Sequence, residues 1–439
     1  MFRQYFTNDA KRLRVLSGVL VILIVAAIGT YLLVGSHAAT PYTSTTADTG
    51  TLANGSTEAQ GCVGASDGNC VVFTQASPMD GKVSLALNQS GTPFSPTSFW
   101  NTPLPADTPT NPNSPTYVSN IVSQLGSSNG NVTTARWSVP FYVVPANQPD
   151  VPIVLNCNSP NCDVNPAVVS LKASLAQGVP IPADAVPAGG TDAHLAVYQP
   201  STNTLWEFWR LSTPANNAPG AGQLPWSVTE AAVPSYGDSQ WHAVWGGVMN
   251  NVSTSNGIFP NPYAGWTTGL PLLGSVARIE ELQAGQINHA IGFSLNSNLI
   301  DSTIPANTTG ATNGISWPAN RSDGTSTDPL AVPEGLRFRL PANLDLSQYD
   351  LSPIAKVIAV TAQKYGLVLD ATGSPVSLLL GDPTPYTVAG LPNPYNTGTG
   401  VGGIGNKGLF NGASQSSIMA NFPWNQLQAL PFNYGEPSQ

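Results

Sequence analysis

Acidic, imidazole and aromatic side chains gather in the stretch GTDAHLAVYQPSTNTLWEFWRL, residues 190–211. Charged residues make up only 9% of the chain, which contains four histidines, so such a group is uncommon in this sequence. Paired carboxyl groups such as Asp192 and Glu207 can act as acid and base, or as nucleophile, on a glycosidic bond. The imidazole of His194 can transfer protons near neutral pH, and indole rings stack on the apolar faces of sugars. The stretch therefore predicts a sugar-processing site.

The same stretch predicts a β-hairpin that would hold these side chains together. HLAVYQ and LWEFWRL flank the turn-forming PSTN, and successive residues of a strand point to opposite faces. An even loop sets Ala196 opposite Glu207 and His194 opposite Trp209, whereas an odd loop would turn Glu207 to the other face. The even register predicts one shared face for Asp192, His194, Tyr198, Glu207 and Trp209. The alternative is a solvated polar sheet face with an ordinary hydrogen bond between histidine and aspartate.

Further indole rings follow in WHAVWGGVMNN, residues 241–251. Trp241 and Trp245 lie on one face of the expected strand, and the Gly-Gly pair would let a ligand approach closely. Packing of the two indoles in the core is the alternative. The predicted sugar-binding residues are Tyr198, Trp206, Trp209, Trp241 and Trp245.

Two further segments contain residues that could take part in a site. RIEELQAGQINHAIGFSL (278–295) places His289 on an apolar strand face after Glu281. Such a histidine is either a core residue with one hydrogen bond or the floor of an apolar cleft. WPANRSDGTSTDPLAVPEGLRFRL (317–340) places Arg321 and Asp323 in a loop. The arginines of this segment could bind a uronic or phosphorylated sugar in bidentate fashion, or could belong to a solvated face or an internal ion pair.

A metal centre is an alternative for the scattered histidines. It would combine His194, Glu207, His242 and His289, but apart from Asp192 and His194 these residues lack the close spacing that metal ligands usually show. We therefore expect no metal ion and no cofactor.

Many short strand-like runs separated by turn formers indicate the fold class. The clearest are WSVPFYVV, HLAVYQ, LWEFWRL, HAVWGGVM, INHAIGFSL, GLRFRL and GLVLDA. Apolar periodicity predicts helices at 115–125, 165–177 and 352–365, the last two followed by glycine. Abundant glycine (42) and proline (40) favour turns over long helices. The prediction is a mainly β protein, an antiparallel, jelly-roll-like β-sandwich with a few peripheral helices.

The N-terminal segment predicts export. Val15 to Val34 is an uncharged apolar run after Lys11, Arg12 and Arg14, long enough for the roughly 20 residues that span a bilayer. The basic flank predicts that the rest of the chain lies outside the cytoplasm, through either an uncleaved anchor or a cleaved signal peptide. We expect an extracellular or cell-surface protein that contacts the membrane only through this segment.

Four cysteines allow three disulfide connectivities. Cys62 and Cys70 bracket one turn-rich loop, and Cys157 and Cys162 bracket another, so we predict these two short-range pairs. A metal site is the weaker alternative, because neither pair has two-residue spacing.

The expected organisation has four parts. Residues 1–38 are the signal peptide or anchor, 39–57 a Thr-rich linker, 58–90 a small β-extension, and 91–439 one large β-sandwich domain. The net charge is −9, and no basic cluster follows the N-terminal segment, so nucleic acid is excluded as a partner. No oligomeric state follows from the sequence.

Six motifs recur in the same order in a family of secreted bacterial proteins of unassigned activity, which this chain resembles over roughly Ser95 to Leu430. They are GTDAHLAVYQPSTNTLWEFWR, WHAVWGGVMNN, GLPLLGSVARIEELQAGQINHAI, PEGLRFRLPANLDL, AQKYGLVLDATG and FPWNQLQAL. The resemblance implies one extracellular domain. It implies functional positions at the motif residues Asp192, His194, Glu207, Glu281 and His289.

These observations predict an extracellular carbohydrate-active protein that binds a polysaccharide or cell-wall glycan. We expect a polysaccharide hydrolase or lyase acting through Asp192, His194 and Glu207. A non-catalytic glycan-binding or adhesion module is the first alternative, and a wall-anchored structural protein is the second.

Overall fold

The computed structural model describes most of the chain from Phe94 onward. The described ranges are 94–126, 129–157, 162–217, 236–263, 265–302, 314–373, 375–396 and 408–437, together with the backbone of two earlier strands. Among these residues no helix is long and apolar enough to cross a membrane, and the predicted segment Val15 to Val34 lies outside them.

The chain divides into two compact units, Met1–Ser77 and Pro78–Gln439. In the first, β1 (Ser56–Gln60) and β2 (Asn69–Phe73) pair antiparallel, with Ala59 opposite Cys70. The strand β2 coincides with the predicted run CVVFTQ. The predicted strand KVSLALN lies outside the described residues, as does Cys62, so the pair Cys62–Cys70 stays a prediction.

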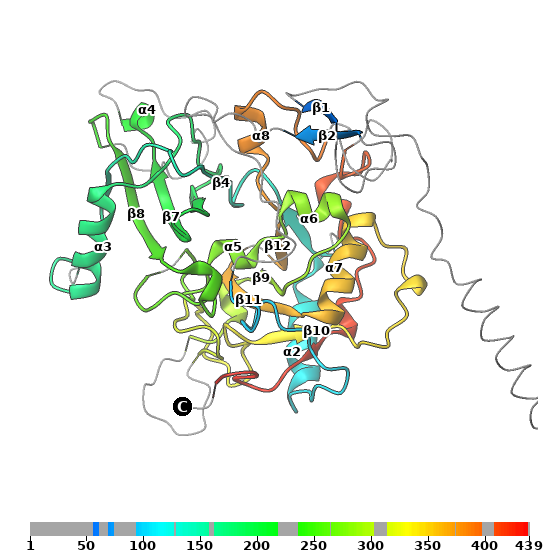
Figure 1. The fold of residues 1–439 in the computed structure, drawn as a ribbon. Helices are drawn as coiled ribbons and strands as arrows, with labels where there is room; N and C mark the ends of the chain where they lie inside the picture. The colour runs from blue at the N-terminus through cyan, green and yellow to red at the C-terminus, as the bar shows by residue number, and fades with distance from the viewer. Residues whose placement is uncertain are drawn as a thin grey trace, which may run out of the picture. The chain divides into compact units, whose positions relative to one another are not determined.

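The second unit contains two sheets (Figure 1). The five-stranded sheet has the order β4-β6-β7-β8-β5, and the six-stranded sheet has the order β13-β10-β11-β9-β12-β3. The strands of the first are β4 (Phe141–Val143), β5 (Ile153–Leu155), β6 (Leu195–Gln199), β7 (Thr204–Ser212) and β8 (Trp241–Met249). Those of the second are β3 (Asn131–Thr133), β9 (Ile291–Leu295), β10 (Arg337–Arg339), β11 (Leu367–Thr372), β12 (Ser377–Leu379) and β13 (Gln428–Ala429).

The three predicted helices are confirmed as α2 (Ser114–Ser123), α3 (Pro166–Gln177) and α7 (Pro353–Lys364). Local sequence explains where two of them begin. The side chain of Asn165 accepts a hydrogen bond from the N–H of Ala167 in α3, and Ser352 accepts one from Ala355 in α7. Shorter helices are α4 (Pro214–Asn217), α5 (Leu272–Ser275), α6 (Ile279–Ala284) and α8 (Thr384–Val388), with 3-10 turns at Val252–Thr254, Ser297–Leu299, Leu346–Gln348, Gln415–Ser417 and Trp424–Gln426.

The described structure is mainly β with few helices, as predicted, but both sheets are mixed, so the antiparallel jelly-roll is not confirmed. The pairs β4–β6, β5–β8, β9–β11 and β3–β12 are parallel. Parallel neighbours need a long crossover connection, which α3 provides between β4 and β6 and α7 between β9 and β11. The prediction treated successive strands as hairpins and missed these crossovers.

Three hydrophobic clusters explain why the layers hold together. One joins the five-stranded sheet to α3, a second lies between the sheets, and the third joins the six-stranded sheet to α2 and α7. On β11, Leu367 and Leu369 belong to the third cluster, whereas Val368 and Ala371 belong to the second. Alternate side chains of β11 therefore point to opposite faces of the six-stranded sheet, and apolar residues pack on both faces.

Candidate active site

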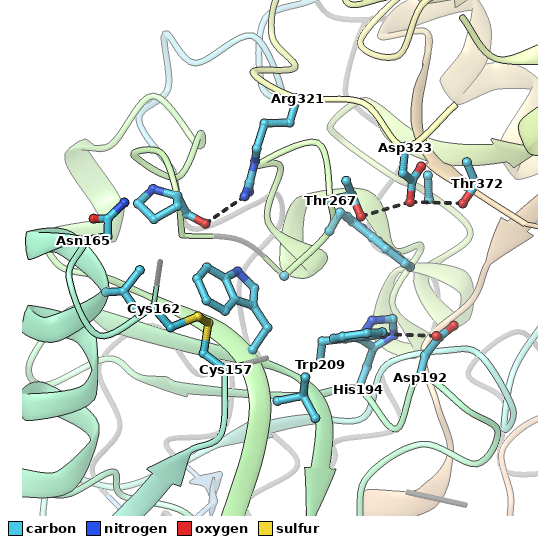
Figure 2. A pocket seen from close by; sticks show the side chains of 17 residues that line it. Cys157, Cys162, Asn165, Asp192, His194, Trp209, Thr267, Arg321, Asp323 and Thr372 are labelled. Carbon is cyan, nitrogen blue, oxygen red and sulfur yellow. Dashed lines mark hydrogen bonds between the residues drawn. A yellow bond between two sulfur atoms is a disulfide. The ribbon is translucent and has the colours of Figure 1, made fainter. Parts of the chain in front are cut away.

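A pocket of about 700 Å³ opens in the second unit (Figure 2). Its walls come from the turn before β6, the adjoining parts of β7 and β8, the start of α3, the loops around residues 262–267 and 321–323, and the end of β11. Seventeen residues from these distant parts of the sequence line it. Among them are the carboxylates Asp192 and Asp323, the cation Arg321, the imidazole of His194 and the indoles of Trp209, Trp245 and Trp266.

The predicted hairpin register is confirmed within β6 and β7, from Leu195 opposite Phe208 to Gln199 opposite Thr204, and the predicted pairing of His194 with Trp209 lies beyond this ladder. The loop between β6 and β7 has four residues, and Ala196 lies opposite Glu207. Just before β6, Asp192 lies beside Trp209, whose indole N–H donates a 3.1 Å hydrogen bond to the carboxylate. Asp192 therefore fixes the orientation of an aromatic ring that faces the pocket.

His194 lines the same wall but is 2% exposed. Its ring meets Trp266 edge to face, with 4.8 Å between the ring centroids. Burial lowers the pKa of His194, and the nearby Asp192 carboxylate only partly opposes this. The ring is therefore neutral at pH 7, and Nδ1 has no hydrogen-bond partner among the described residues.

Two of the predicted sugar-binding residues reach the pocket. Trp209 on β7 lies directly opposite Trp245 on β8, so their indoles are neighbours on one sheet face. The prediction is wrong for Trp206, Trp241 and Tyr198, which are buried in the hydrophobic clusters. Their apolar bodies complete the core, which was the alternative interpretation of the indole pattern.

The opposite wall contains a carboxyl pair that the sequence analysis did not select. Asp323 is exposed to the pocket, and its Oδ2 accepts hydrogen bonds from the hydroxyls of Thr267 (3.0 Å) and Thr372 (3.2 Å) (Figure 2). Behind it, the fully buried Glu334 accepts a 3.1 Å hydrogen bond from the N–H of Asp323. Burial, and next the negative charge of Asp323, raise the pKa of Glu334 well above its usual range. Glu334 thus holds a proton more tightly than an ordinary carboxyl group does, and it lies beside the pocket-facing Asp323.

Arg321 lies near Asp323 in sequence and lines the pocket from the same loop. Its guanidinium donates hydrogen bonds to the side chain of Asn320 and to the carbonyl oxygens of Pro262 and Tyr263. All three acceptors are neutral.

Comparison of the chain with protein-family models, curated proteins and solved structures gives no match.

Glu207 does not line the pocket, contrary to the prediction. It is completely buried, and its two carboxyl oxygens accept hydrogen bonds from the N–H groups of Leu272 (2.7 Å) and Leu273 (2.9 Å) at the start of α5. Burial raises the pKa of Glu207 to about 8, although these two hydrogen bonds oppose the rise. Gly265 lies between Glu207 and the pocket, because a Cβ there would overlap Glu207 Oε2.

Glu281 and His289 do not line the pocket and form a separate buried cluster. Glu281 Oε1 accepts hydrogen bonds from Arg278 Nη2 (2.8 Å) and His289 Nε2 (2.9 Å). Burial alone would raise the pKa of Glu281, but the charges of Arg278 and His289 outweigh it and the pKa is lowered. The carboxyl also accepts a bond from the N–H of Arg278, which fixes the first turn of α6. The hydrogen bonds described for this cluster thus all lie within the protein.

No group of three or more His, Cys, Asp or Glu side chains within the described ranges could hold a metal ion. His242 is engaged elsewhere, between Asn156 (2.6 Å) and Asp238 (2.9 Å). The four residues of the alternative metal centre are therefore not assembled.

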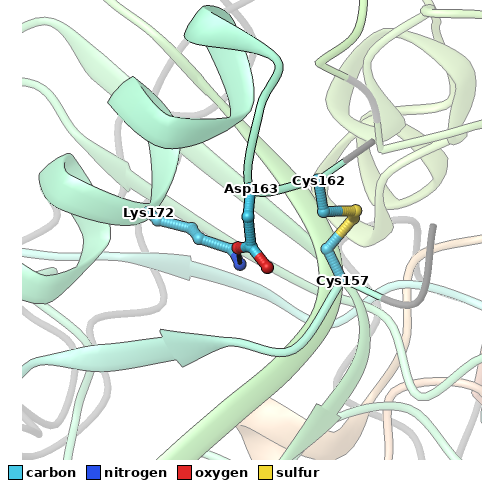
Figure 3. The surroundings of a disulfide bond; sticks show 4 residues. All are labelled: Cys157, Cys162, Asp163 and Lys172. Carbon is cyan, nitrogen blue, oxygen red and sulfur yellow. Dashed lines mark hydrogen bonds and ion pairs between the residues drawn. A yellow bond between two sulfur atoms is a disulfide. The ribbon is translucent and has the colours of Figure 1, made fainter. Parts of the chain in front are cut away.

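The disulfide Cys157–Cys162 is present, as predicted, with 6.0 Å between the Cα atoms (Figure 3). Both cysteines line the pocket next to Asn165, the residue that caps α3. Close to the disulfide, Asp163 forms an exposed ion pair with Lys172.

Proposed function

We propose that the protein is an extracellular carbohydrate-active enzyme that cleaves a glycosidic bond in this pocket. The observation that carries the proposal is the placing of Asp192 and Asp323 on different walls of one aromatic-lined cavity. Two carboxyl groups flanking a glycosidic bond are the usual requirement for its hydrolysis. The backbone N–H of Asp323 donates a hydrogen bond to the carboxyl group of Glu334, so these two residues lie on the same wall and act as one proton-holding unit.

The surroundings of the two carboxyl groups suggest their roles. Glu334 holds the proton of the pair, and Asp323, which faces the pocket, relays this proton to the leaving oxygen. Glu334 is a positioning residue that acts through Asp323. Asp192 is the carboxylate of the opposite wall, acting as base or nucleophile. Trp209 and Trp245 are the platforms on which sugar rings stack.

The test is turnover of neutral and acidic polysaccharides by the wild type and by Asp323→Asn. We expect a loss of at least about 100-fold in kcat, the usual scale for removing a general acid. The control is Asp163→Asn, which changes an exposed carboxylate outside the pocket lining and should leave kcat unchanged. Wild-type turnover retained in Asp323→Asn would refute the assignment. A lyase would release an unsaturated product that absorbs ultraviolet light, which separates elimination from hydrolysis.

A non-catalytic glycan-binding module is the second candidate, and the neighbouring indoles of Trp209 and Trp245 favour it. In that case no polysaccharide is cleaved, whereas Trp209→Ala weakens glycan binding.

Export is part of the proposal. The cysteine pair in a short loop supports it, because disulfides persist mainly in oxidising compartments.

A further inference from the structure

We propose that the pocket takes an acidic glycan, with Arg321 binding the carboxylate of a uronate residue. The inference rests on the proposed function, because it names the substrate class of the same site.

Arg321 is a cation without a counterion in the described structure. Among the described residues, no Asp or Glu oxygen lies within 4.0 Å of its nitrogens. Burial lowers the pKa of Arg321, and no neighbouring charge contributes to the shift. Partial burial of a positive charge lowers the stability of the folded protein unless a negative group pairs with it.

The geometry of the guanidinium leaves donors for a ligand. Its Nε, Nη1 and Nη2 each donate one hydrogen bond, to Asn320, Pro262 and Tyr263 respectively. A guanidinium has five N–H groups, so two remain, one on each terminal nitrogen. Such a planar fork matches a carboxylate in bidentate fashion. The three existing bonds hold the fork in place before the ligand arrives, which reduces the entropy lost on binding.

The other charges of the pocket limit where an anion can bind. Asp192 and Asp323 are carboxylates and would repel a second acidic group, and His194 is neutral. Arg321 is thus the favourable position for negative charge among the residues that line the pocket. A sugar with a single carboxylate fits this arrangement better than a densely charged polymer such as a polyphosphate.

The test compares glycans that differ only in charge. Oligosaccharides of galacturonate, glucuronate and mannuronate are each titrated against the full exported chain in a calorimeter, beside their methyl esters. We expect at least one acidic oligosaccharide to bind about 10-fold or more tightly than its ester, the usual scale for charge-assisted hydrogen bonds. Arg321→Gln should remove this preference, and Arg321→Lys should retain part of it because the charge stays and the fork is lost. Lys172→Gln removes the same charge from α3 outside the pocket and should change nothing.

The outcomes distinguish this inference from the proposed function. Equal affinity for acid and ester in the wild type, or an unchanged preference in Arg321→Gln, overturns the role of Arg321 while glycan cleavage can still stand. Tighter binding of a phosphorylated or sulfated oligosaccharide than of every uronate also overturns the choice of carboxylate. Failure of all neutral and acidic glycans to bind refutes the proposed function itself. The comparison of acid and ester needs only the wild type, so it holds even if Arg321→Gln does not fold.

Discussion

Asp192 combines two tasks that a pair of substitutions can separate. Its Oδ1 holds the indole of Trp209, and its negative charge faces the pocket. Asp192→Asn keeps an acceptor for the indole and removes the charge, so we expect kcat to fall about 100-fold with glycan affinity retained. Asp192→Ala also frees the ring and should weaken binding. The kcat and KM of both variants measure this, and near-normal kcat in Asp192→Asn would reduce Asp192 to a positioning residue for Trp209.

Glu207 is expected to matter for stability instead of turnover. Its oxygens satisfy the N–H groups of Leu272 and Leu273. Glu207→Gln turns an N–H₂ group toward one of these donors, so we expect a loss of about 1–3 kcal/mol in the free energy of unfolding, the cost of an unsatisfied buried group. Urea unfolding measures this, with the exposed Glu436→Gln as control. If Glu207→Gln folds with unchanged stability but loses most of its kcat, Glu207 takes part in the reaction and this prediction is wrong.

The residues of the site were only partly predictable from sequence. Asp192, His194 and Trp209 were found because strand alternation brings near neighbours in sequence together. Asp323 and Glu334 both lie in the irregular segment before β10, where no local period reveals a contact. Charged residues make up only 9% of the chain, so the presence of Asp323 and Glu334 after Arg321 in one short segment could have indicated a site. Glu207 was misassigned because alternation gives the face of a sheet and not what covers that face.

At the scale of elements, local patterns predicted α2, α3, α7 and the hairpin of β6 and β7. The strands β3, β5, β12 and β13 are two or three residues long and carry too few residues to show a period. Parallel pairing of β9 with β11 depends on contacts more than 70 residues apart in sequence, such as Leu367 opposite Ile291. Such parallel pairing depends on how the crossover helix packs, so the periodicity of a short sequence segment does not predict it.

The disulfide joins β5 to the start of α3 and should stabilise this corner of the pocket. Closing a loop of this length removes unfolded-chain entropy equivalent to about 2 kcal/mol. The double variant Cys157→Ser/Cys162→Ser should lose about that much in urea unfolding and bind glycan more weakly. The same urea unfolding experiment on Cys62→Ser/Cys70→Ser tests the predicted second disulfide. Reaction of the native protein with a thiol reagent at Cys157 or Cys162 would contradict the bond.

At the scale of the whole molecule, two sheets enclose carboxyl groups in their core. Asp370 on β11 is fully buried close to Gly292 of β9, where a Cβ would overlap its carboxyl group. Burial raises the pKa of Asp370 to about 7 and that of Asp382 to about 7. With Glu207 and Glu334, four buried carboxyl groups thus have raised pKa values in the folded state.

These groups predict that the protein becomes less stable as pH rises. In the unfolded chain these groups lose their protons near pH 4. In the folded protein Asp370 and Asp382 keep them up to about pH 7 and Glu207 up to about pH 8, and the pKa of Glu334 is also raised well above its usual range. The folded state therefore binds more protons between these values, and the free energy of unfolding falls as pH rises through this window. The lowered pKa of buried His194 makes the free energy of unfolding rise with pH below about pH 6.5. This single group is outweighed by the four buried carboxyl groups. We expect the thermal midpoint to decrease from pH 5 to pH 8.

The variant Asp370→Asn provides the matched control, because it keeps the size of the side chain and removes one titrating group. Its thermal midpoint should depend less steeply on pH than that of the wild type, with the difference confined to the range between about pH 4 and pH 7. Scanning calorimetry across pH 4 to 9 measures both profiles. A wild-type midpoint that rises steadily toward pH 8 would mean that the buried carboxyl groups are ionised and compensated in the folded protein. The enclosed carboxyl groups would then be a source of stability at neutral pH, and the expected preference for acidic surroundings would be wrong.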